Sequence, residues 1–259
     1  MLRPRITPCL LRHNGGLVKT RQFKDPKYVG DPLNAVKIFN EKEVDELMFL
    51  DIDATVQGRD PDFALLRSLA VESRMPLCYG GGITTASQGL KIVALGVEKL
   101  SISSSAVRRP KLIQEMAEAV GAQSVVITVD VRKNKLFSGY TIYTHNGKEK
   151  HRVDLLEFCQ QAAELGAGEI VINSIDRDGE MQGYDLDLAK KVRETVNCPL
   201  SFVGGAGTID HMRSLIDEVG TVGAVSGSMF VFKGVYRAVL INYPSKNEKS
   251  QLIFKRPLT

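Results

Sequence analysis

Cysteine is sparse in this sequence, and none of its four cysteines is spaced as a CxxC pair. Cys9, Cys78, Cys159 and Cys198 stand mostly within apolar runs, which is typical of small buried residues in a reducing compartment. No apolar run reaches the roughly 18 residues that cross a membrane. The opening MLRPRITPCLL also lacks a signal-peptide core followed by a cleavage site. We therefore expect a cytoplasmic protein without disulfides and without a membrane partner.

An excess of charge of one sign is also lacking. The chain has 34 basic and 30 acidic residues, a net charge of +4, and no long run of lysine or arginine. This balance argues against a nucleic-acid partner. No dinucleotide-binding glycine fingerprint follows a strand. The histidines have no metal-ligand spacing, so we expect no cofactor and no metal, and we place all four histidines in surface loops: His13, His145, His151 and His211.

Short apolar runs alternate with amphipathic segments along the whole chain. Nearly continuous apolar strands separated by helices are typical of a parallel sheet that is covered on both faces. The expected strands are RITPCLL (5–11), ELMFLDI (46–52), PLCYG (76–80), EKLSIS (98–103), SVVITVD (124–130), EIVINSI (169–175), PLSFVG (199–204) and GAVSG (223–227). Eight such units predict one closed (β/α)8 TIM barrel over residues 1–259. A doubly wound open sheet is the alternative.

Local signals place several helices and one insertion. Asp31 followed by Pro32 predicts a helix start, and the same device recurs with Asp60 and Pro61. A further helix is expected to begin after Thr208 or Asp210 and to end at Gly220. In KLFSGYTIYTHNGKEK, the Asn146-Gly147 pair predicts a hairpin inserted after the fifth strand.

An internal repeat divides the chain into two similar halves. QGRD at 57–60 recurs as QGYD at 182–185, and PLCYGGGIT from Pro76 matches PLSFVGGAGT from Pro199. Each half supplies four strand–helix units, so we interpret the barrel as two half-barrels, at about 1–122 and 123–245. Residues 246–259 are expected to form a peripheral tail.

Glycine clusters follow the third and seventh strands, at repeat-equivalent positions. Glycine lets backbone N–H groups converge on an anion where the next helix begins. We therefore predict two phosphate sites at the mouth of the barrel, and hence a substrate with two phosphates. The alternative is that these glycines only form tight turns. The first site comprises Gly81, Gly82, Ser103 and Ser104; the second comprises Gly179 of the DRDG loop, Gly204, Gly205 and Ser228.

The segment GGLVKTRQFKDPKYVG is long and basic for a connection after a strand. It carries Lys19, Arg21, Lys24 and Lys27, which suits a lid over an anionic substrate. Lys19 is the residue that we expect to contact the substrate. A solvated surface loop is the alternative.

Carboxylates end three of the expected strands. Asp130 ends the fifth, Asp51 and Asp53 end the second, and Asp178 follows the sixth. A carboxylate that points into a partly dry site can act as a general acid or base, and Asp130 is our candidate, with a structural capping role as the alternative. By the half-barrel repeat, the first strand places Leu11 opposite Asp130.

These motifs together resemble a known family. The segments RITPCLL…GGLVK, DELMFLDI, PLCYGGGI, GVEKLSI, GAGEIVINSIDRDGEMQGYDLDL and VGGAGTIDH are similar to the cyclase subunit of imidazole glycerol phosphate synthase, HisF, over about residues 5–243. The resemblance implies a (β/α)8 barrel that forms a heterodimer with a HisH-like glutaminase. Ammonia from the glutaminase would cross the barrel and react at the far mouth with a bis-phosphorylated ribonucleotide.

The resemblance also assigns roles to residues. It implies that Asp130 is the general acid or base and that Lys19, Asp51 and Asp178 contact the substrate. It implies phosphate binding by Gly82, Gly179 and Gly205. Its ammonia gate corresponds to a ring of four charged residues, for which a purely structural salt-bridge ring is the alternative: Arg5, Glu46, Lys99 and Glu169.

The departures from the family gather at the reacting mouth. The family's aspartate at the end of the first strand is Leu11 here, and Ser103, Asn173 and Val203 replace its asparagine, threonine and serine. The opening and closing segments resemble a divergent branch associated with amidation of surface-polysaccharide sugars. The sequence therefore favours an ammonia-using synthase for such a sugar. The alternatives are a histidine-pathway cyclase and a non-catalytic ammonia channel that hands ammonia to a third protein.

Overall fold

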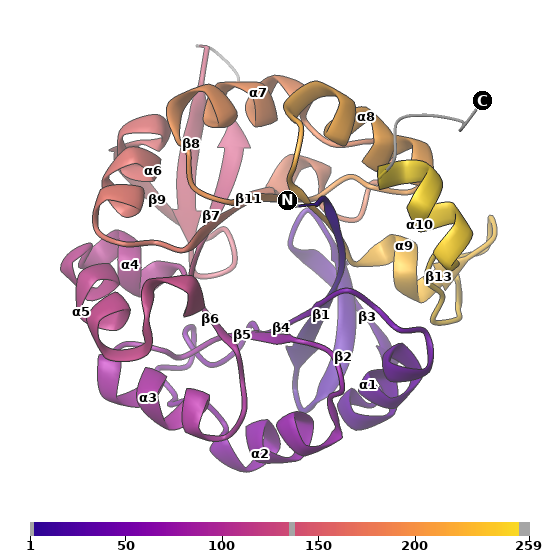
Figure 1. The fold of residues 1–259 in the computed structure, drawn as a ribbon, viewed down its shortest axis with the longest axis horizontal. Coiled ribbons are helices and arrows are strands. Elements are labelled where there is room, and N and C mark those ends of the chain that lie inside the picture. Colours follow the sequence, from indigo (N-terminus) through magenta and orange to yellow (C-terminus); the bar gives the residue numbers. More distant parts are fainter. Residues whose placement is uncertain (1–2, 135–137, 254–259) are drawn as a thin grey trace.

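The computed structural model describes residues 3–134 and 138–253, and its parallel strands close into a barrel. Each strand pairs in parallel with the next, and the last pairs with the first. All eight expected strands and the (β/α)8 fold are thus confirmed (Figure 1). The strands are β1 (Arg5–His13), β4 (Leu47–Asp51), β5 (Leu77–Gly80), β6 (Lys99–Ile102), β7 (Val125–Lys133), β10 (Glu169–Ser174), β11 (Leu200–Val203) and β12 (Gly223–Ser226).

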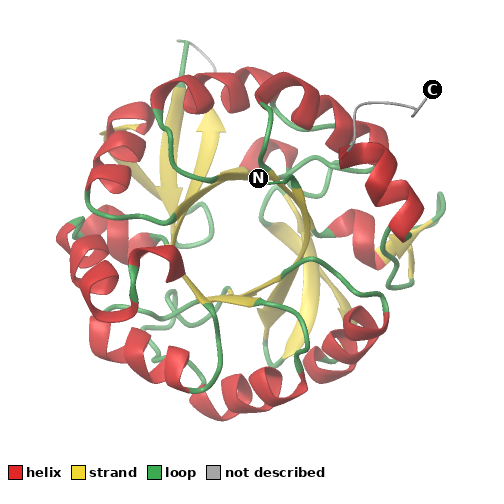
Figure 2. Ribbon diagram, in the orientation of Figure 1, coloured by secondary structure: helices red, strands yellow, loops and turns green. Residues whose placement is uncertain are grey.

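Helices surround the strands and cover the outer face of the sheet (Figure 2). The long helices that follow the barrel strands turn an apolar stripe inward; α5, for example, buries Leu112, Ile113 and Met116. The long helices are α1 (Pro32–Glu41), α2 (Phe63–Glu72), α3 (Ala86–Ala94), α5 (Lys111–Val120), α6 (Leu155–Glu164), α7 (Leu186–Thr195), α8 (Ile209–Val219) and α10 (Lys246–Ile253). Shorter turns are α4 (Ser104–Arg108), α9 (Ser228–Val231), η1 (Ala122–Ser124) and η2 (Ile175–Arg177).

Antiparallel hairpins extend two barrel strands at the mouth. The expected insertion after β7 is confirmed as β8 (Tyr140–Thr144) and β9 (Glu149–Asp154), with Asn146 and Gly147 in its turn; residues 135–137 of that segment lie outside the described residues. The basic segment after β1, expected as a loop, is instead a hairpin of β2 (Gly16–Arg21) and β3 (Lys24–Gly30). A third, small hairpin joins β13 (Phe232–Lys233) to β14 (Ala238–Val239).

Helix caps confirm two predictions and correct a third. Asp31 accepts a hydrogen bond from the Asn34 N–H at the start of α1, and α8 begins after Thr208 and ends at Gly220. The cap expected at Asp60 is wrong. Asp62 caps α2 through the Leu65 N–H at 3.0 Å, whereas Asp60 accepts a hydrogen bond from Gln88 in the next unit.

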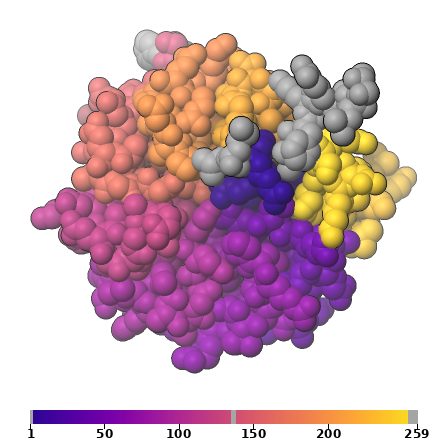
Figure 3. Space-filling view, in the orientation of Figure 1, coloured from indigo at the N-terminus to yellow at the C-terminus, as the bar shows by residue number. Residues whose placement is uncertain are grey.

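The two ends of the described chain meet on one face of the barrel. The Tyr243 hydroxyl donates to the Ile6 carbonyl at 2.8 Å, and Lys249 of α10 pairs with Asp45 at 2.9 Å. Figure 3 shows the indigo N-terminal residues and yellow α10 on this same face. The tail after Pro244 therefore contributes a helix, with Leu252 buried, while residues 254–259 lie outside the described range.

Across the described segments 3–134 and 138–253, no helix is both long enough and apolar enough to cross a membrane.

The cap of α1 gives a first prediction. Replacing an N-cap aspartate by alanine leaves a helix N–H without its acceptor, so Asp31→Ala should lower the free energy of unfolding by about 1 kcal/mol. Urea denaturation measures this change. Glu41→Ala, at the other end of the same helix, is the control and should change the value by less than about 0.5 kcal/mol. Equal effects of the two substitutions would contradict the capping role.

Candidate active site

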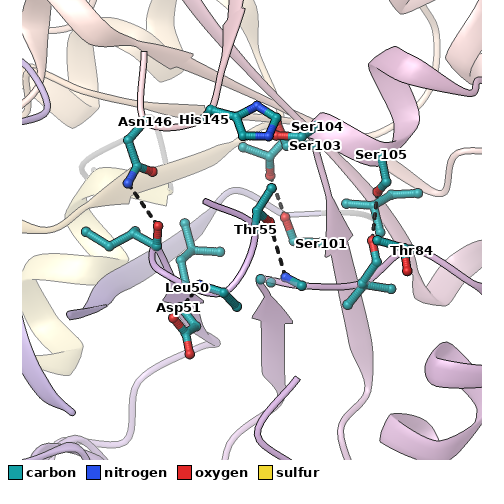
Figure 4. A pocket seen from close by; sticks show the side chains of 18 of the residues that line it. Leu50, Asp51, Thr55, Thr84, Ser101, Ser103, Ser104, Ser105, His145 and Asn146 are labelled. Atoms are coloured by element: carbon teal, nitrogen blue, oxygen red, sulfur yellow. Dashed lines mark hydrogen bonds between the residues drawn. The ribbon is translucent and has the colours of Figure 1, made fainter. Parts of the chain in front are cut away.

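The main cavity of the barrel lies at the C-terminal ends of its strands, where barrel active sites form. It has a volume of about 640 Å³, within the range that holds a small-molecule ligand. Figure 4 shows part of its wall, with Leu50 and Asp51 of β4, Ser101 of β6 and, from the β8–β9 turn, His145 and Asn146. The Asn146 side chain donates to the Ile52 carbonyl at 2.9 Å and so fixes that turn over the mouth. Six predicted residues line the cavity: Asp51, Gly81, Gly82, Ser103, Ser104 and Asp130.

Asp130 lies at the inner end of this cavity. It retains some contact with the cavity, but protein atoms enclose its carboxyl, which accepts a hydrogen bond from Asn173 at 2.9 Å. Burial raises the pKa of Asp130 to about 7; the neighbouring Asp178 adds to the rise and the Asn173 bond opposes it. A carboxyl with this pKa can exchange a proton near neutral pH.

An apolar wall faces Asp130. Leu11 of β1 lies in register with Leu50 of β4, and both line the cavity. Val203 of β11 joins them above the apolar interior of the barrel. The position opposite Asp130 therefore carries a hydrocarbon side chain, as the half-barrel repeat predicts.

Asp51 is held by an ion pair that the sequence analysis did not anticipate. Arg12 donates to Asp51 at 2.8 Å and to Asp62 at 2.9 Å, which ties the end of β1 to the start of α2. The second oxygen of Asp51 accepts the backbone N–H groups of Asp53 and Ala54, both at 3.0 Å. Asp51 is only 3% exposed. Arg12 balances its charge, and both of its carboxylate oxygens accept hydrogen bonds from the protein itself.

A second carboxylate at the end of β4 has partners of its own. Asp53 accepts the Asn14 backbone N–H at 2.8 Å and contacts His13 Nδ1 at 2.7 Å. Burial alone would raise the pKa of Asp53, but these hydrogen bonds and the nearby imidazole lower it. Asp53 therefore orders the β1–β2 turn.

Close backbone packing explains both glycine clusters. A side chain on Gly81 would collide with Asp51, and one on Gly204 would lie 2.6 Å from the Ser174 carbonyl at the repeat-equivalent strand end. Gly82 and Gly205 likewise abut the backbone of the loops that precede α2 and α7. Turn geometry therefore suffices to require glycine here, and phosphate binding stays a prediction.

The second predicted phosphate site lies outside the main cavity. Gly204, Gly205, Gly179 and Ser228 are not among the residues that line the cavity, and neither are Lys19 and Asp178. The Gly179 carbonyl accepts a hydrogen bond from Arg237 at 2.6 Å, and Ser228 opens α9. Within the described residues, the main cavity thus covers only the first of the two expected phosphate sites.

Lys19 is a buried residue of β2, and half-buried Asp178 lies against the β2–β3 hairpin. Lys19 is 5% exposed, its amine donates to the Cys9 carbonyl, and burial lowers its pKa. Asp178 accepts from the Thr20 hydroxyl at 2.7 Å, and burial raises its pKa. The exposed Arg21 pairs with Glu180 at 2.6 Å. Lys19 is thus not a surface lysine.

Three arginines at the rim of the cavity were missed by the sequence analysis: Arg59, Arg108 and Arg109. Arg109 pairs with Glu115 at 2.6 Å, whereas the nearest carboxylate oxygens lie 3.8 Å from Arg59 and 3.9 Å from Arg108. The signal was present in the sequence, because QGRD and AVRRP lie in the connections that follow two of the expected strands. These guanidinium groups add positive charge beside the first phosphate site.

The four predicted gate residues meet at the opposite end of the barrel. Arg5 pairs with Glu46 at 2.8 Å and with Glu169 at 2.6 Å, and Lys99 lies 2.8 Å from each of the same glutamates. Burial alone would raise the pKa of Glu169, but Arg5 and Lys99 lower it. The ring is therefore closed, with every charge paired.

Between the ring and the mouth the interior is apolar. Six inward side chains form a collar above the ring: Cys9, Met48, Cys78, Val126, Val171 and Val225. A small cavity of about 10 Å³ lies between ring and collar, close to the size that admits one water-sized molecule. A charged end, an apolar middle and a polar mouth follow one another along the axis.

We expected all four histidines in surface loops, and this is wrong for three of them. His13 is in β1, His151 is in β9, His211 is in α8 and bonds the Gly207 N–H, and His145 lies in the β8–β9 turn above the cavity. Among residues 3–134 and 138–253, no group of three or more His, Cys, Asp or Glu side chains is arranged to hold a metal ion.

Comparison with known proteins agrees with this architecture. Residues 5–237 match the family described as histidine biosynthesis protein. A Vibrio vulnificus protein provisionally named as a HisF-type subunit of imidazole glycerol phosphate synthase is 54% identical over 98% of this chain and 97% of its own. A similarly named Leptospira borgpetersenii protein is 51% identical over 97% and 99%. The imidazole glycerol phosphate synthase subunit HisF of Clostridium botulinum is 37% identical over 95% and 97%. The chain therefore belongs to the histidine biosynthesis protein family, as a barrel of the HisF type.

Proposed function

We propose that this barrel receives ammonia from a glutaminase subunit at the ring end and uses it at the mouth on a phosphorylated acceptor. The paired ring of Arg5, Glu46, Lys99 and Glu169 supports entry at that end. The apolar collar suits the passage of a small neutral molecule, because a charged one would be costly to desolvate there. Asp130 and the first phosphate site supply acid–base chemistry and substrate binding at the mouth.

The acceptor that we propose is a sugar of a surface polysaccharide, which would be amidated. The observation that carries this choice is Leu11, which stands where the resembling cyclases have their second aspartate. Leu50 of β4 and Val203 of β11 extend the same apolar wall, so neither of these neighbouring positions supplies a carboxylate opposite Asp130. Arg12 further occupies Asp51, an expected substrate contact.

A histidine-pathway cyclase is the second candidate. The relatives named as imidazole glycerol phosphate synthase subunits favour it, and Asp130 and the ring are common to both functions. The two candidates differ in whether one carboxyl suffices for the cyclisation.

Turnover of the histidine-pathway substrate separates these candidates. With ammonium salt as the nitrogen source, we expect no turnover by the natural chain. We expect Leu11→Asp to gain activity, near the lower end of the roughly 10²- to 10⁴-fold that a general acid or base contributes, because the new carboxyl enters apolar surroundings. Product formation by the purified subunit is the measurement.

Two controls accompany that assay. Leu11→Asn has the shape of the aspartate without its acid and should gain nothing, and Asp130→Asn added to Leu11→Asp should remove the gain. Robust turnover by the natural chain, abolished by Asp130→Asn, would make the protein a histidine-pathway cyclase and overturn the sugar acceptor.

The raised pKa of Asp130 predicts how stability depends on pH. An unfolded aspartate titrates near pH 3.9, about three units lower, so the folded chain holds the proton more tightly. Between about pH 4 and 7 unfolding therefore releases this proton, and the folded state loses stability as pH rises through that window. The loss is at most about 4 kcal/mol. Chemical denaturation should show a smaller loss for Asp130→Asn.

The matched control for that experiment is Asp187→Asn, because the Asp187 side chain is 79% exposed on α7. It should leave the pH dependence of the natural chain in place. The same slope in all three proteins would show that Asp130 is not desolvated as described.

A further inference from the structure

An unpaired acceptor lies at the inner end of the main cavity. Asn173 is 7% exposed and lines the cavity, yet its Oδ1 atom has no hydrogen-bond partner among the described residues. Its Nδ2 atom donates to Asp130 Oδ1 at 2.9 Å, which is the orientation of the amide that an ionised Asp130 requires, since the reverse would place two acceptor oxygens together. An unpaired buried acceptor costs about 1–3 kcal/mol, so a donor from a ligand is expected here.

The strand register shows where this acceptor stands on the barrel axis. Asn173 is the neighbour of Asp130, and two residues deeper Val171 is the neighbour of Thr128. The Thr128 hydroxyl contacts the Ser101 hydroxyl at 2.7 Å, in register with Val171 and Val126 of the apolar collar. A small molecule that passes the collar therefore meets these hydroxyl groups on one side and then Asn173 and Asp130 at the mouth.

These acceptors all lie on one side of the mouth. They come from β6, β7 and β10, whereas the facing side chains Leu11, Leu50 and Val203 offer none. The nearby cations are already engaged, because Lys19 donates to the Cys9 carbonyl and Arg12 bridges Asp51 and Asp62. A ligand with several N–H groups fits this arrangement best.

We propose that Asp130, Asn173 and Thr128 form a binding site for ammonium and ammonia, with Asn173 as the residue that positions the nitrogen. This inference rests on the proposed use of ammonia. One N–H of the ligand donates to Asn173 Oδ1 and another to the Asp130 carboxylate. An ammonium ion that enters from the mouth transfers one proton to that carboxylate, which leaves neutral ammonia with a free electron pair and Asp130 as a carboxylic acid. Ammonia that arrives through the collar is already neutral and binds without this step.

Titration of Asp130 by carbon-13 NMR tests the site directly on the full chain. The carboxyl signal is followed against pH in ammonium chloride, in potassium chloride and in tetramethylammonium chloride at equal ionic strength. We expect a lower midpoint in ammonium than in the other two salts, because only ammonium donates hydrogen bonds and stabilises the carboxylate. The carboxylate of Asp178 raises the pKa of Asp130, and it is present in all three salts.

Variants separate positioning from a general charge effect. Asn173→Val should raise the Asp130 midpoint in potassium, since the Nδ2 bond is lost, and should abolish the difference between the salts. Asn34→Val on the exposed face of α1 should leave that difference intact. Equal midpoints in the three salts for the natural chain, or an ammonium effect that survives Asn173→Val, would overturn the proposal. If Asn173→Val does not fold, the comparison of ammonium with tetramethylammonium in the natural chain decides.

Neither a glutaminase nor an acceptor takes part in this titration. A negative result would therefore remove the ammonium site and leave the proposed acceptor to the turnover experiment.

Discussion

Closure of the eight-stranded sheet is the constraint on which the rest of this molecule depends. A strand directs alternate side chains to opposite faces, so a closed barrel collects every second side chain into one enclosed column. In that column a charged residue must find an opposite charge, and a polar residue must find a hydrogen bond. The first condition is met by the ring of four charged residues, Arg5, Lys99, Glu46 and Glu169, in which each charge has an opposite partner. Removing one partner from a buried pair typically costs about 3–5 kcal/mol.

The same column separates two kinds of chemistry. The ring keeps Glu169 ionised by placing it between two cations, Arg5 and Lys99, which lower its pKa. At the mouth Asp130 lacks such a cation, and burial raises its pKa. One barrel thus contains a carboxylate fixed in its charged form and another ready to change its protonation, with an apolar collar between them.

How far the sequence predicts this structure depends on whether a feature is local. The eight strands follow from continuous apolar runs, and the caps at Asp31 and Thr208 follow from adjacent residues. The displaced cap at Asp62 does not, because an arginine from another unit holds it. The β2–β3 hairpin was missed because its turn uses non-glycine residues at positive φ, Gln22 and Phe23, which carry no turn signal. The gate residues were assigned through a resemblance, whereas Asp130 was proposed from its place at the end of a strand. Only the register of the closed sheet explains why they share one axis.

The ion pair of Arg12 with Asp51 and Asp62 has a consequence for any second carboxyl at this mouth. Arg12 directly follows Leu11, and its guanidinium already bridges two carboxylates from different units. Because neighbouring side chains of a strand point to opposite faces, this guanidinium is directed away from the interior side chain at position 11. An aspartate at position 11 would enter beside Leu50 and Val203, where burial raises the pKa of a carboxyl. Arg12 thus joins two strand–helix units without lending its charge to the barrel interior, and a second acid at this mouth would have no cation of its own.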